Sequence, residues 1–149
     1  MSHIDGNIDL VALIKAEIET QSPMPFDRFM DLALYHPTWG YYLQAQSPMG
    51  PAGDYMTAPE FSSHFSRSLA VLLQRVMQTL KSATPTTPQE ERNLSVLELG
   101  PGRGILARNL LEYCPEITHY YLLERSTTLI AEQKRQISAL SPALQSKCI

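Results

Sequence analysis

The chain has 149 residues, the size of a single domain. Its 44% apolar and 18% charged residues exclude a disordered tail and a coiled coil. The net charge of −3, without a basic stripe, argues against nucleic acid or an anionic membrane surface as a partner. Apolar runs are only a few residues long, too short to cross a bilayer.

Targeting and metal signals are weak in this sequence. The first residues lack a basic, apolar or arginine-rich leader. The two cysteines, Cys114 and Cys148, lie far apart, which favours reduced thiols over a structural pair. The four histidines have no cysteine or carboxylate at ligand spacing, so we expect no metal. Together these features predict a cytoplasmic protein.

Helical periodicity dominates the first half of the chain. Apolar spacing predicts a helix around residues 10–18 and a second from near Pro25 to Tyr35, followed by a turn at residues 37–40. A third helix is predicted to start near Thr57, with Pro59 and Glu60 in its first turn. Its expected apolar stripe comprises Phe61, Phe65, Leu69, Leu72, Leu73, Val76, Met77 and Leu80.

Residues 81–93 are rich in Thr, Pro and charge, which predicts a linker between a helical region, residues 1–80, and a second region, residues 94–149. The second region alternates a strand, Leu94–Leu99, a helix, a strand, His119–Glu124, and a helix from Ser126 to about Leu140. This βαβα order predicts an α/β fold with a doubly wound parallel sheet. The apolar first strand predicts burial on both faces.

The turn after the first strand carries the strongest local signal. Glu98 stands two positions before a GxGxG pattern formed by Gly100, Gly102 and Gly104. Small residues let a ligand approach the backbone, and the following helix N-terminus presents free N–H groups to a carboxylate or phosphate. The spacing differs from the GxGxxG of dinucleotide-binding turns. Arg103 either touches a ligand carboxylate or lies in solvent.

Glu124 ends the second strand, 20 residues after Gly104. A carboxylate there can accept hydrogen bonds from both ribose hydroxyls of an adenosine ligand. Taken singly, Glu98 is explained as a helix-dipole partner and Glu124 as a solvated strand end. Together with the glycine turn, the two carboxylates predict a nucleoside-binding site.

These motifs resemble a known family. Glu98–Gly104 followed by Tyr120–Glu124 resembles the first two motifs of Rossmann-like S-adenosylmethionine (SAM) methyltransferases. The strings at Phe29–Pro37, Gly40–Tyr42 and above all Gly53–Glu60 (GDYMTAPE) resemble the MidA family of bacteria and mitochondria, which includes a complex I assembly factor that methylates a protein arginine. The resemblance covers nearly the whole chain in the family's order. The chain departs from the family pattern at Phe61, Ser66, Arg125 and Thr127.

The resemblance implies SAM as the cofactor and a protein as the methyl acceptor, with no role for nucleic acid or a membrane. Glu98 would meet the amino group of the methionine moiety, Glu124 would hold the ribose, and residues 50–60 would form a flap over the pocket. The cofactor-binding residues so implied are Glu98, Gly100, Gly102, Gly104, Glu124, Gly53, Asp54, Tyr55, Thr57 and Glu60. A turn leading into a capped helix is the alternative for Thr57–Glu60, but it does not account for Gly53–Tyr55.

Two other functions remain alternatives: an NAD(P)-dependent oxidoreductase, against which the GxGxG spacing speaks, and a non-catalytic assembly partner that retains the fold. Acceptor-binding groups in this fold class follow later strands, so we assign no catalytic residue. With two clear strands, we expect residues 94–149 to be the first half of a SAM-binding domain, with an open sheet. We also expect this chain to transfer no methyl group by itself.

Overall fold

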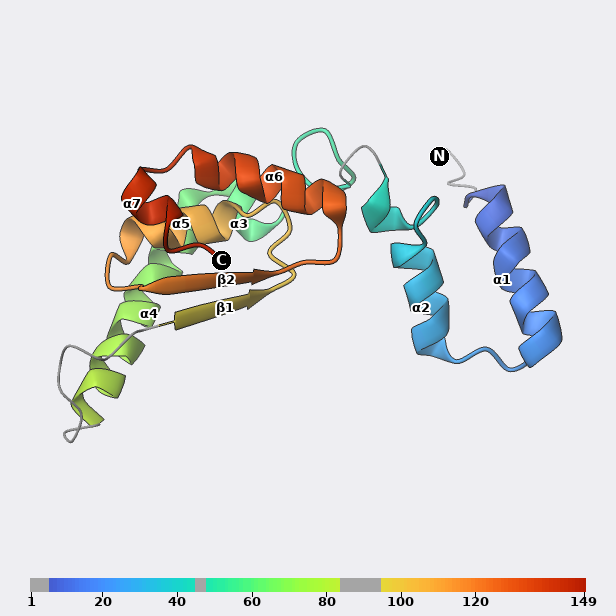
Figure 1. The fold of residues 1–149 in the computed structure, drawn as a ribbon, viewed down its shortest axis with the longest axis horizontal. Coiled ribbons are helices and arrows are strands. Elements are labelled where there is room, and N and C mark those ends of the chain that lie inside the picture. The colour runs from blue at the N-terminus through green and yellow to red at the C-terminus, as the bar shows by residue number, and fades with distance from the viewer. Residues whose placement is uncertain (1–5, 45–47, 84–94) are drawn as a thin grey trace.

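The computed structural model describes residues 6–44, 48–83 and 95–149 (Figure 1). Along the chain the elements are α1 Ile8–Gln21, α2 Phe26–Tyr35, the 3₁₀ helix η1 Tyr41–Leu43, α3 Ala58–Phe61, α4 Ser63–Ala83, β1 Ser95–Leu99, α5 Ile105–Tyr113, β2 His119–Leu123, α6 Thr127–Ser138 and α7 Pro142–Gln145. Most of the predicted linker, residues 84–93, lies outside the described residues. Within the described part, no helix has the length and apolar character needed to cross a membrane.

The sheet is parallel, as predicted. β1 and β2 pair in register, with Leu99 opposite Leu123. On the other side of β2, the Ile149 N–H donates to the Tyr120 carbonyl at 2.9 Å, and the Leu122 N–H donates to the Ile149 carbonyl at 3.1 Å. The last residues of the chain therefore run beside β2, and β2 lies between them and β1.

The core lies between one face of this sheet and the helices α4, α5 and α6. Tyr120 on β2 is 1% exposed and packs with Leu111 and Ile117, which are fully buried. Ala70 and Met77 bring α4 into the same cluster. Burial is therefore concentrated where the helices meet the sheet.

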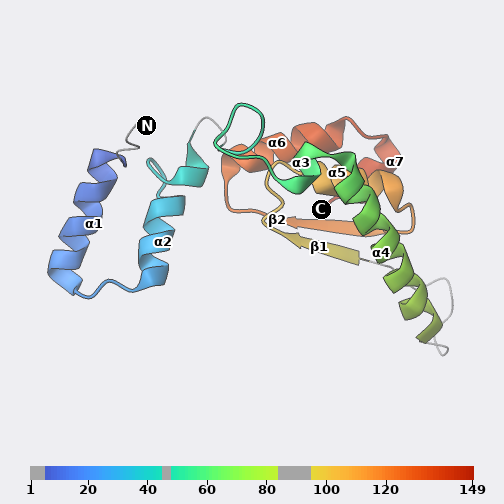
Figure 2. The same ribbon diagram turned by 180° about the vertical axis from the view of Figure 1, so that it is seen from behind.

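The opposite face of the sheet is open. Leu97, Leu99 and Leu123 are 62%, 69% and 62% exposed. The prediction that the first strand is buried on both faces is therefore wrong for this chain, because among the described residues helices cover one face only (Figures 1 and 2). The expectation of an open sheet is confirmed for this face only, since α4, α5 and α6 cover the other.

The third predicted helix is divided. Ser62 has extended backbone angles, φ −155° and ψ 137°, and separates α3 from α4. Thr57 and Glu60 form the capping box that starts α3. Phe61 is 82% exposed, contrary to its predicted place in the apolar stripe, because the break at Ser62 separates it from α4.

Only part of the α4 stripe is buried. Leu69, Leu73 and Met77 pack on the core, whereas the more outward members of the stripe are exposed, because α4 packs mainly against α5. The exposed members are Phe65, Leu72, Val76 and Leu80.

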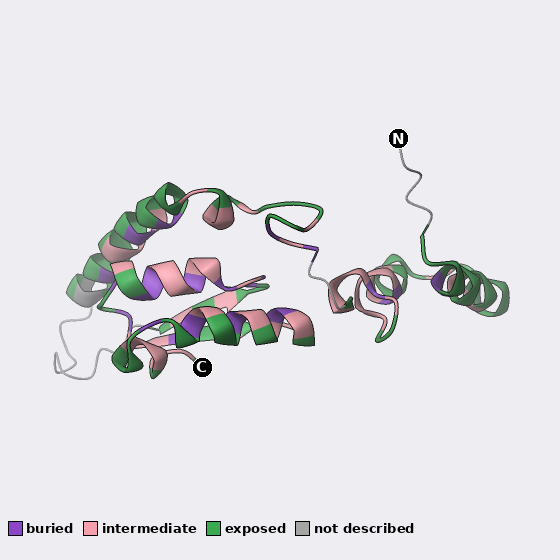
Figure 3. Ribbon diagram, turned by 90° about the horizontal axis from the view of Figure 1, so that it is seen from above, coloured by how far each residue is buried: buried purple, intermediate pink, exposed green. Residues whose placement is uncertain are grey.

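The α1–α2 hairpin lies to one side of the sheet and its covering helices (Figures 1 and 2). It contacts them at the start of α6. Arg125 pairs with Asp31 at 2.8 Å, and its guanidinium lies 4.1 Å from the centroid of the Tyr35 ring. Much of α1 is exposed along its length, with Leu10 as its buried residue (Figure 3).

Candidate functional site

The glycine turn between β1 and α5 has the backbone that its sequence predicts. Gly100, Gly102 and Gly104 have φ angles of +65°, +56° and +80°, in the left-handed region that side chains with a Cβ rarely adopt. The Gly100 N–H donates to the Leu123 carbonyl at 2.9 Å, which ties the turn to the end of β2. A Cβ at Gly100 would have no atom within 4 Å. The turn therefore has open space beside its first glycine.

The register of the strands brings both predicted carboxylates to the same edge of the sheet. Glu98 immediately precedes Leu99, and Glu124 immediately follows its partner, Leu123. The Tyr120 hydroxyl donates to Glu98 Oε2 at 2.8 Å. Burial raises the pKa of Glu98, and this hydrogen bond opposes the rise.

Glu124 is held by backbone amides rather than by side chains. Its Oε1 accepts hydrogen bonds from the N–H groups of Arg125 at 2.7 Å and Ser126 at 2.9 Å. Ser126 in turn caps α6, accepting from the Leu129 N–H at 3.3 Å. The carboxylate is therefore oriented at the point where β2 gives way to α6.

A cavity of about 140 Å³ lies between the glycine turn and the start of α3. It brings together four of the predicted site residues from distant parts of the chain, Glu98, Gly100, Thr57 and Glu60. The other residues lining it are Met49, Pro59, Pro101, Arg103, Ile105 and Leu106.

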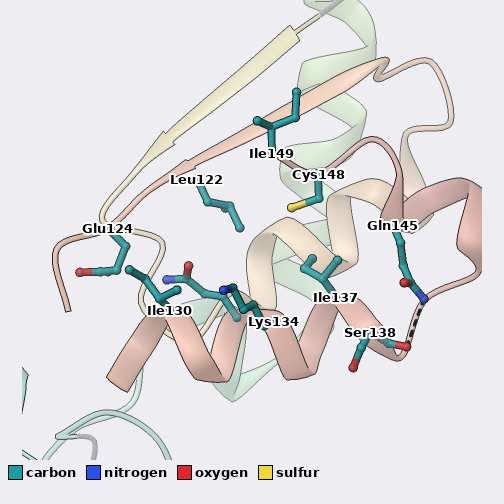
Figure 4. Close-up of a pocket in the computed structure, with 10 residues that line it drawn as sticks. Leu122, Glu124, Ile130, Lys134, Ile137, Ser138, Gln145, Cys148 and Ile149 are labelled. Carbon is teal, nitrogen blue, oxygen red and sulfur yellow. Dashed lines mark hydrogen bonds between the residues drawn. The ribbon is translucent and has the colours of Figure 1, made fainter. Parts of the chain in front are cut away.

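Glu124 lines a different cavity, of about 390 Å³, between β2, α6 and the end of the chain (Figure 4). Ile130, Ile137 and Leu122 give this cavity a largely apolar lining. The predicted site residues are thus brought to one sheet edge but are divided between two cavities.

Gly53, Asp54 and Tyr55 line neither of these two cavities. Asp54 accepts a hydrogen bond from the Tyr41 hydroxyl at 2.8 Å, and burial together with this bond raises the pKa of Tyr41 to about 12. The Tyr55 and Tyr42 hydroxyls lie 3.3 Å apart. These contacts join the loop before α3 to η1.

The loop Pro48–Tyr55 closes on itself. The Gly50 N–H donates to the Tyr55 carbonyl at 2.9 Å, and the Asp54 N–H donates to the Pro48 carbonyl at 2.8 Å. A Cβ on Gly53 would collide with the Pro48 carbonyl, so the tight closure itself requires this glycine. Gly53 therefore has a structural explanation that the sequence motif alone did not supply.

The same loop contacts the glycine turn. A Cβ on Gly102 would lie 2.5 Å from the terminal methyl of Met49. Arg103 pairs with Glu60 at 3.3 Å and with Glu132 of α6 at 2.5 Å. The sequence predicted that Arg103 either touches a ligand carboxylate or lies in solvent. Neither prediction includes the ion pairs with Glu60 and Glu132. They join positions 43 and 29 residues apart, so no local signal could have revealed them.

Residues 68–148 match the model of the family described as "Putative S-adenosyl-L-methionine-dependent methyltransferase". A curated relative, the protein arginine methyltransferase NDUFAF7 homolog, mitochondrial, of Drosophila melanogaster, is 32% identical over 72% of this chain and 22% of its own length. The human protein arginine methyltransferase NDUFAF7, mitochondrial, is 31% identical over 64% of this chain and 20% of its own length. The chain thus spans about a fifth of the length of these relatives.

Two solved structures from Burkholderia thailandensis have a similar fold. A likely methyl transferase of the COG1565 superfamily, bound to S-adenosyl-homocysteine, has a TM-score of 0.75 and 30% identity, over 95% of this chain and 36% of its own. A native structure from the same superfamily has a TM-score of 0.68 and 29% identity, over 95% of this chain and 34% of its own.

The predicted cytoplasmic location is contradicted, because the curated relatives are named as mitochondrial proteins. The prediction rested on composition and on two free thiols. These are physical properties that soluble domains of several compartments share, so they do not identify the compartment.

The family match spans more than half of the chain, and its segment contains the glycine turn and both strand-end carboxylates. The helical N-terminal part followed by a parallel βαβα unit agrees with the predicted α/β fold. We conclude that the chain belongs to a family of S-adenosyl-L-methionine-dependent methyltransferases, whose cofactor is SAM.

Proposed function

We propose that this chain forms the SAM-binding part of a protein arginine methyltransferase. The observation that carries the proposal is the left-handed glycine turn at the carboxyl end of β1, with Glu98 and Glu124 at the same sheet edge. Ligands of open α/β sheets bind outside the carboxyl ends of the strands. The names of the curated relatives support a protein arginine as the acceptor.

The residues present suit this cofactor. Glu98 Oε2 is engaged by Tyr120, and within the described part of the chain Oε1 accepts no hydrogen bond, so it is available to the ammonium of the methionine moiety. Likewise, Glu124 Oε1 holds two backbone N–H groups, which leaves Oε2 for the ribose hydroxyls. The open space at Gly100 admits a ligand close to the backbone.

The flap assigned to residues 50–60 supplies Thr57 and Glu60 to the wall of the cavity. We assign supporting roles to Gly53, Asp54 and Tyr55, which shape the loop, and to Gly102 and Gly104, which form the turn. The cavity of about 140 Å³ is smaller than the roughly 300–1,000 Å³ of typical small-molecule sites. We therefore expect side chains of the cavity wall to shift when the cofactor binds.

The cofactor supplies a methyl group already activated on a sulfonium, so the protein must align an acceptor and exclude water. An arginine acceptor remains protonated and its charge is delocalised, so carboxylates must localise that charge away from the reacting nitrogen. We assign cofactor binding to residues 94–149 together with the flap from the helical region 1–80. The transfer itself we assign to the family protein as a whole.

Isothermal titration calorimetry of the 149-residue chain tests the cofactor assignment. We expect S-adenosyl-homocysteine to bind and NAD to give no heat above dilution. Binding of NAD with no binding of S-adenosyl-homocysteine would contradict the proposal. For the acceptor, a family protein that carries these residues is incubated with methyl-tritiated SAM and arginine peptides, with matched lysine peptides as the control. Label in the lysine peptides alone would refute the arginine assignment.

A further inference from the structure

Arg103 lies between Gly102 and Gly104 in the glycine turn. Its side chain extends away from the turn and contacts two other elements. One nitrogen reaches Glu60, in the first turn of α3 directly after the loop, and another reaches Glu132 on α6. The guanidinium is a planar fork of donors, and this geometry lets one side chain hold two carboxylates in different directions.

The carboxylate of Glu60 is shielded from water, whereas the Arg103 side chain is 24% exposed. The Glu60 side chain is 5% exposed, and its second oxygen accepts a hydrogen bond from the Thr57 N–H at 3.3 Å. A carboxylate buried to this degree needs a charge partner, because removal from water disfavours an isolated charge. Arg103 is the cation that the structure places against it.

The Arg103 side chain passes close to the backbone of the loop. Gly50 has a φ of +100°, and a Cβ there would collide with the Arg103 guanidinium. Met49, the residue before Gly50, lies against Gly102. The loop thus rests on the turn at two neighbouring points, an apolar contact and an ion pair.

The contact between Arg103 and Glu132 connects α6 to the glycine turn. Gln133, next along α6, donates from Nε2 to the Gly102 carbonyl at 2.7 Å and is 4% exposed. The turn is therefore held from α6 by one neutral and one charged hydrogen bond, and from the loop by the pair with Glu60.

We infer that Arg103 is a positioning residue, which, through Glu60 in the first turn of α3, fastens the loop Pro48–Tyr55 over the glycine turn and thereby slows dissociation of the cofactor. The inference rests on the proposed cofactor site. Arg103 also lines the small cavity, but its positioning role depends on its ion pairs with Glu60 and Glu132 rather than on a bond to the cofactor. Its effect is on how long the loop stays closed over that site.

The first test needs no ligand. Hydrogen exchange is measured by NMR or mass spectrometry on the wild-type chain and on Arg103→Gln, at the amides of Gly50, Gly53 and Asp54. These three amides, together with that of Tyr55, donate the hydrogen bonds that close the loop. We expect their protection in Arg103→Gln to fall by about tenfold, while the amides of α5 exchange as in the wild type. Unchanged protection in the loop would overturn the inference.

Arg135→Gln is the matched control. Arg135 also pairs with Glu132, at 3.4 Å, but its side chain is 74% exposed and the described residues show no ion pair between it and the loop. Its exchange pattern in the loop should equal that of the wild type. If Arg135→Gln opens the loop as far as Arg103→Gln does, the effect comes from loss of positive charge near Glu132, and the inference fails.

The second test measures the cofactor. Dissociation of S-adenosyl-homocysteine is followed by stopped flow for Arg103→Gln, Glu60→Gln and the double variant. We expect each single variant to dissociate about tenfold faster, and the double variant to be no faster than either, because both lose the same contact. An open loop with an unchanged dissociation rate, or additive effects, would refute the positioning role. If the wild type binds no S-adenosyl-homocysteine, the proposed function fails, while the exchange test still decides whether Arg103 fastens the loop.

Should Arg103→Gln lower the thermal midpoint so far that it is not folded, Glu60→Gln decides the exchange test, and its dissociation rate is read together with loop protection because Glu60 also lines the cavity. Glu60→Gln retains an amide oxygen for the Thr57 N–H and removes the charge that Arg103 engages. Loop protection and dissociation rates equal to those of the wild type in this variant would overturn the inference.

Discussion

The hydroxyl of Tyr120 donates a hydrogen bond to Glu98 Oε2 at 2.8 Å, although the two residues lie on different strands. Val96 is the residue directly opposite Tyr120, so Glu98 is its diagonal neighbour on the same face of the sheet. Burial and the neighbouring Glu98 raise the pKa of Tyr120, so the phenol keeps its proton and donates a hydrogen bond to the Glu98 carboxylate. Burial also raises the pKa of Glu98, and the hydrogen bond from Tyr120 opposes that rise. This arrangement orients a half-buried carboxylate toward the glycine turn.

Replacing Glu98 with Gln should separate stability from binding. The folded pKa of Glu98 is raised, so its carboxylate form opposes folding once the pH exceeds its unfolded pKa. We expect Glu98→Gln to have a higher free energy of unfolding at pH 7 and weaker binding of S-adenosyl-homocysteine. The stability gain should vanish as the pH falls below the ordinary carboxyl pKa, where Glu98 is protonated in both states. Urea titrations at several pH values and calorimetry measure the two effects.

Tyr120→Phe removes the hydrogen bond that opposes the pKa rise of Glu98. The pKa of Glu98 should therefore rise further. The ionised carboxylate is the form that binds the ammonium of the cofactor. As the pH is lowered, this variant should therefore lose affinity at a higher pH than the wild type does. Dissociation constants of S-adenosyl-homocysteine measured across the acidic range test this. Superimposable pH profiles would show that Glu98 does not meet the cofactor's ammonium.

Glu124→Ala should weaken binding of the cofactor by about 2–3 kcal/mol, or about 30- to 150-fold, because two charge-assisted bonds to ribose are lost. Glu112→Ala, at an exposed position on α5, is the control and should bind as the wild type does. Calorimetry gives both constants. An unchanged constant for Glu124→Ala would remove this residue from the site.

Gly102→Val should abolish binding of S-adenosyl-homocysteine with little change in the far-UV circular dichroism spectrum. The backbone at Gly102 has a φ of +56°, which a β-branched residue does not tolerate, and its Cβ would press on Met49. Gly6→Val is the control, because a Cβ there meets its nearest atom at an ordinary 3.6 Å. Normal binding by Gly102→Val would mean that the turn does not lie beneath the cofactor.

The open face of the sheet should make this chain self-associate. Leu97 and Leu123 are each 62% exposed on neighbouring strands, and contiguous apolar surface of this kind promotes aggregation. The double variant Leu97→Lys/Leu123→Lys should bind less of the dye ANS and scatter less light, with an unchanged circular dichroism spectrum. Gln78→Lys, exposed on α4, adds the same kind of charge elsewhere and should leave both signals as in the wild type.

Local patterns predicted much of this structure. The spacing of apolar residues indicated α2, α5 and α6, and the pair Thr57 and Glu60 indicated the capped start of α3. The glycine turn was predictable because its left-handed backbone angles leave few residue types other than glycine. The positions of Glu98 and Glu124 at one sheet edge followed from the parallel order of the strands.

Burial was less predictable than the elements. The apolar character of Leu97 and Leu99 indicated a strand with two covered faces, but which face is covered depends on the elements that pack against it. In the same way, the stripe of α4 is wider than the surface that α5 covers, so Leu72 is exposed while Met77 is buried. A sequence pattern records which residues favour burial, and it does not record whether a partner is present.

By itself, the sequence determined the two strands, the glycine turn and the two strand-end carboxylates, because each depends on the conformational or chemical preferences of adjacent residues. Only the tertiary structure decided that Arg103 would join Glu60 and Glu132, and that Glu98 and Glu124 would line different cavities. These relationships depend on how a loop and two helices pack around the turn. Contacts between residues far apart in the chain produce no regular spacing in the sequence, so no local motif predicts them.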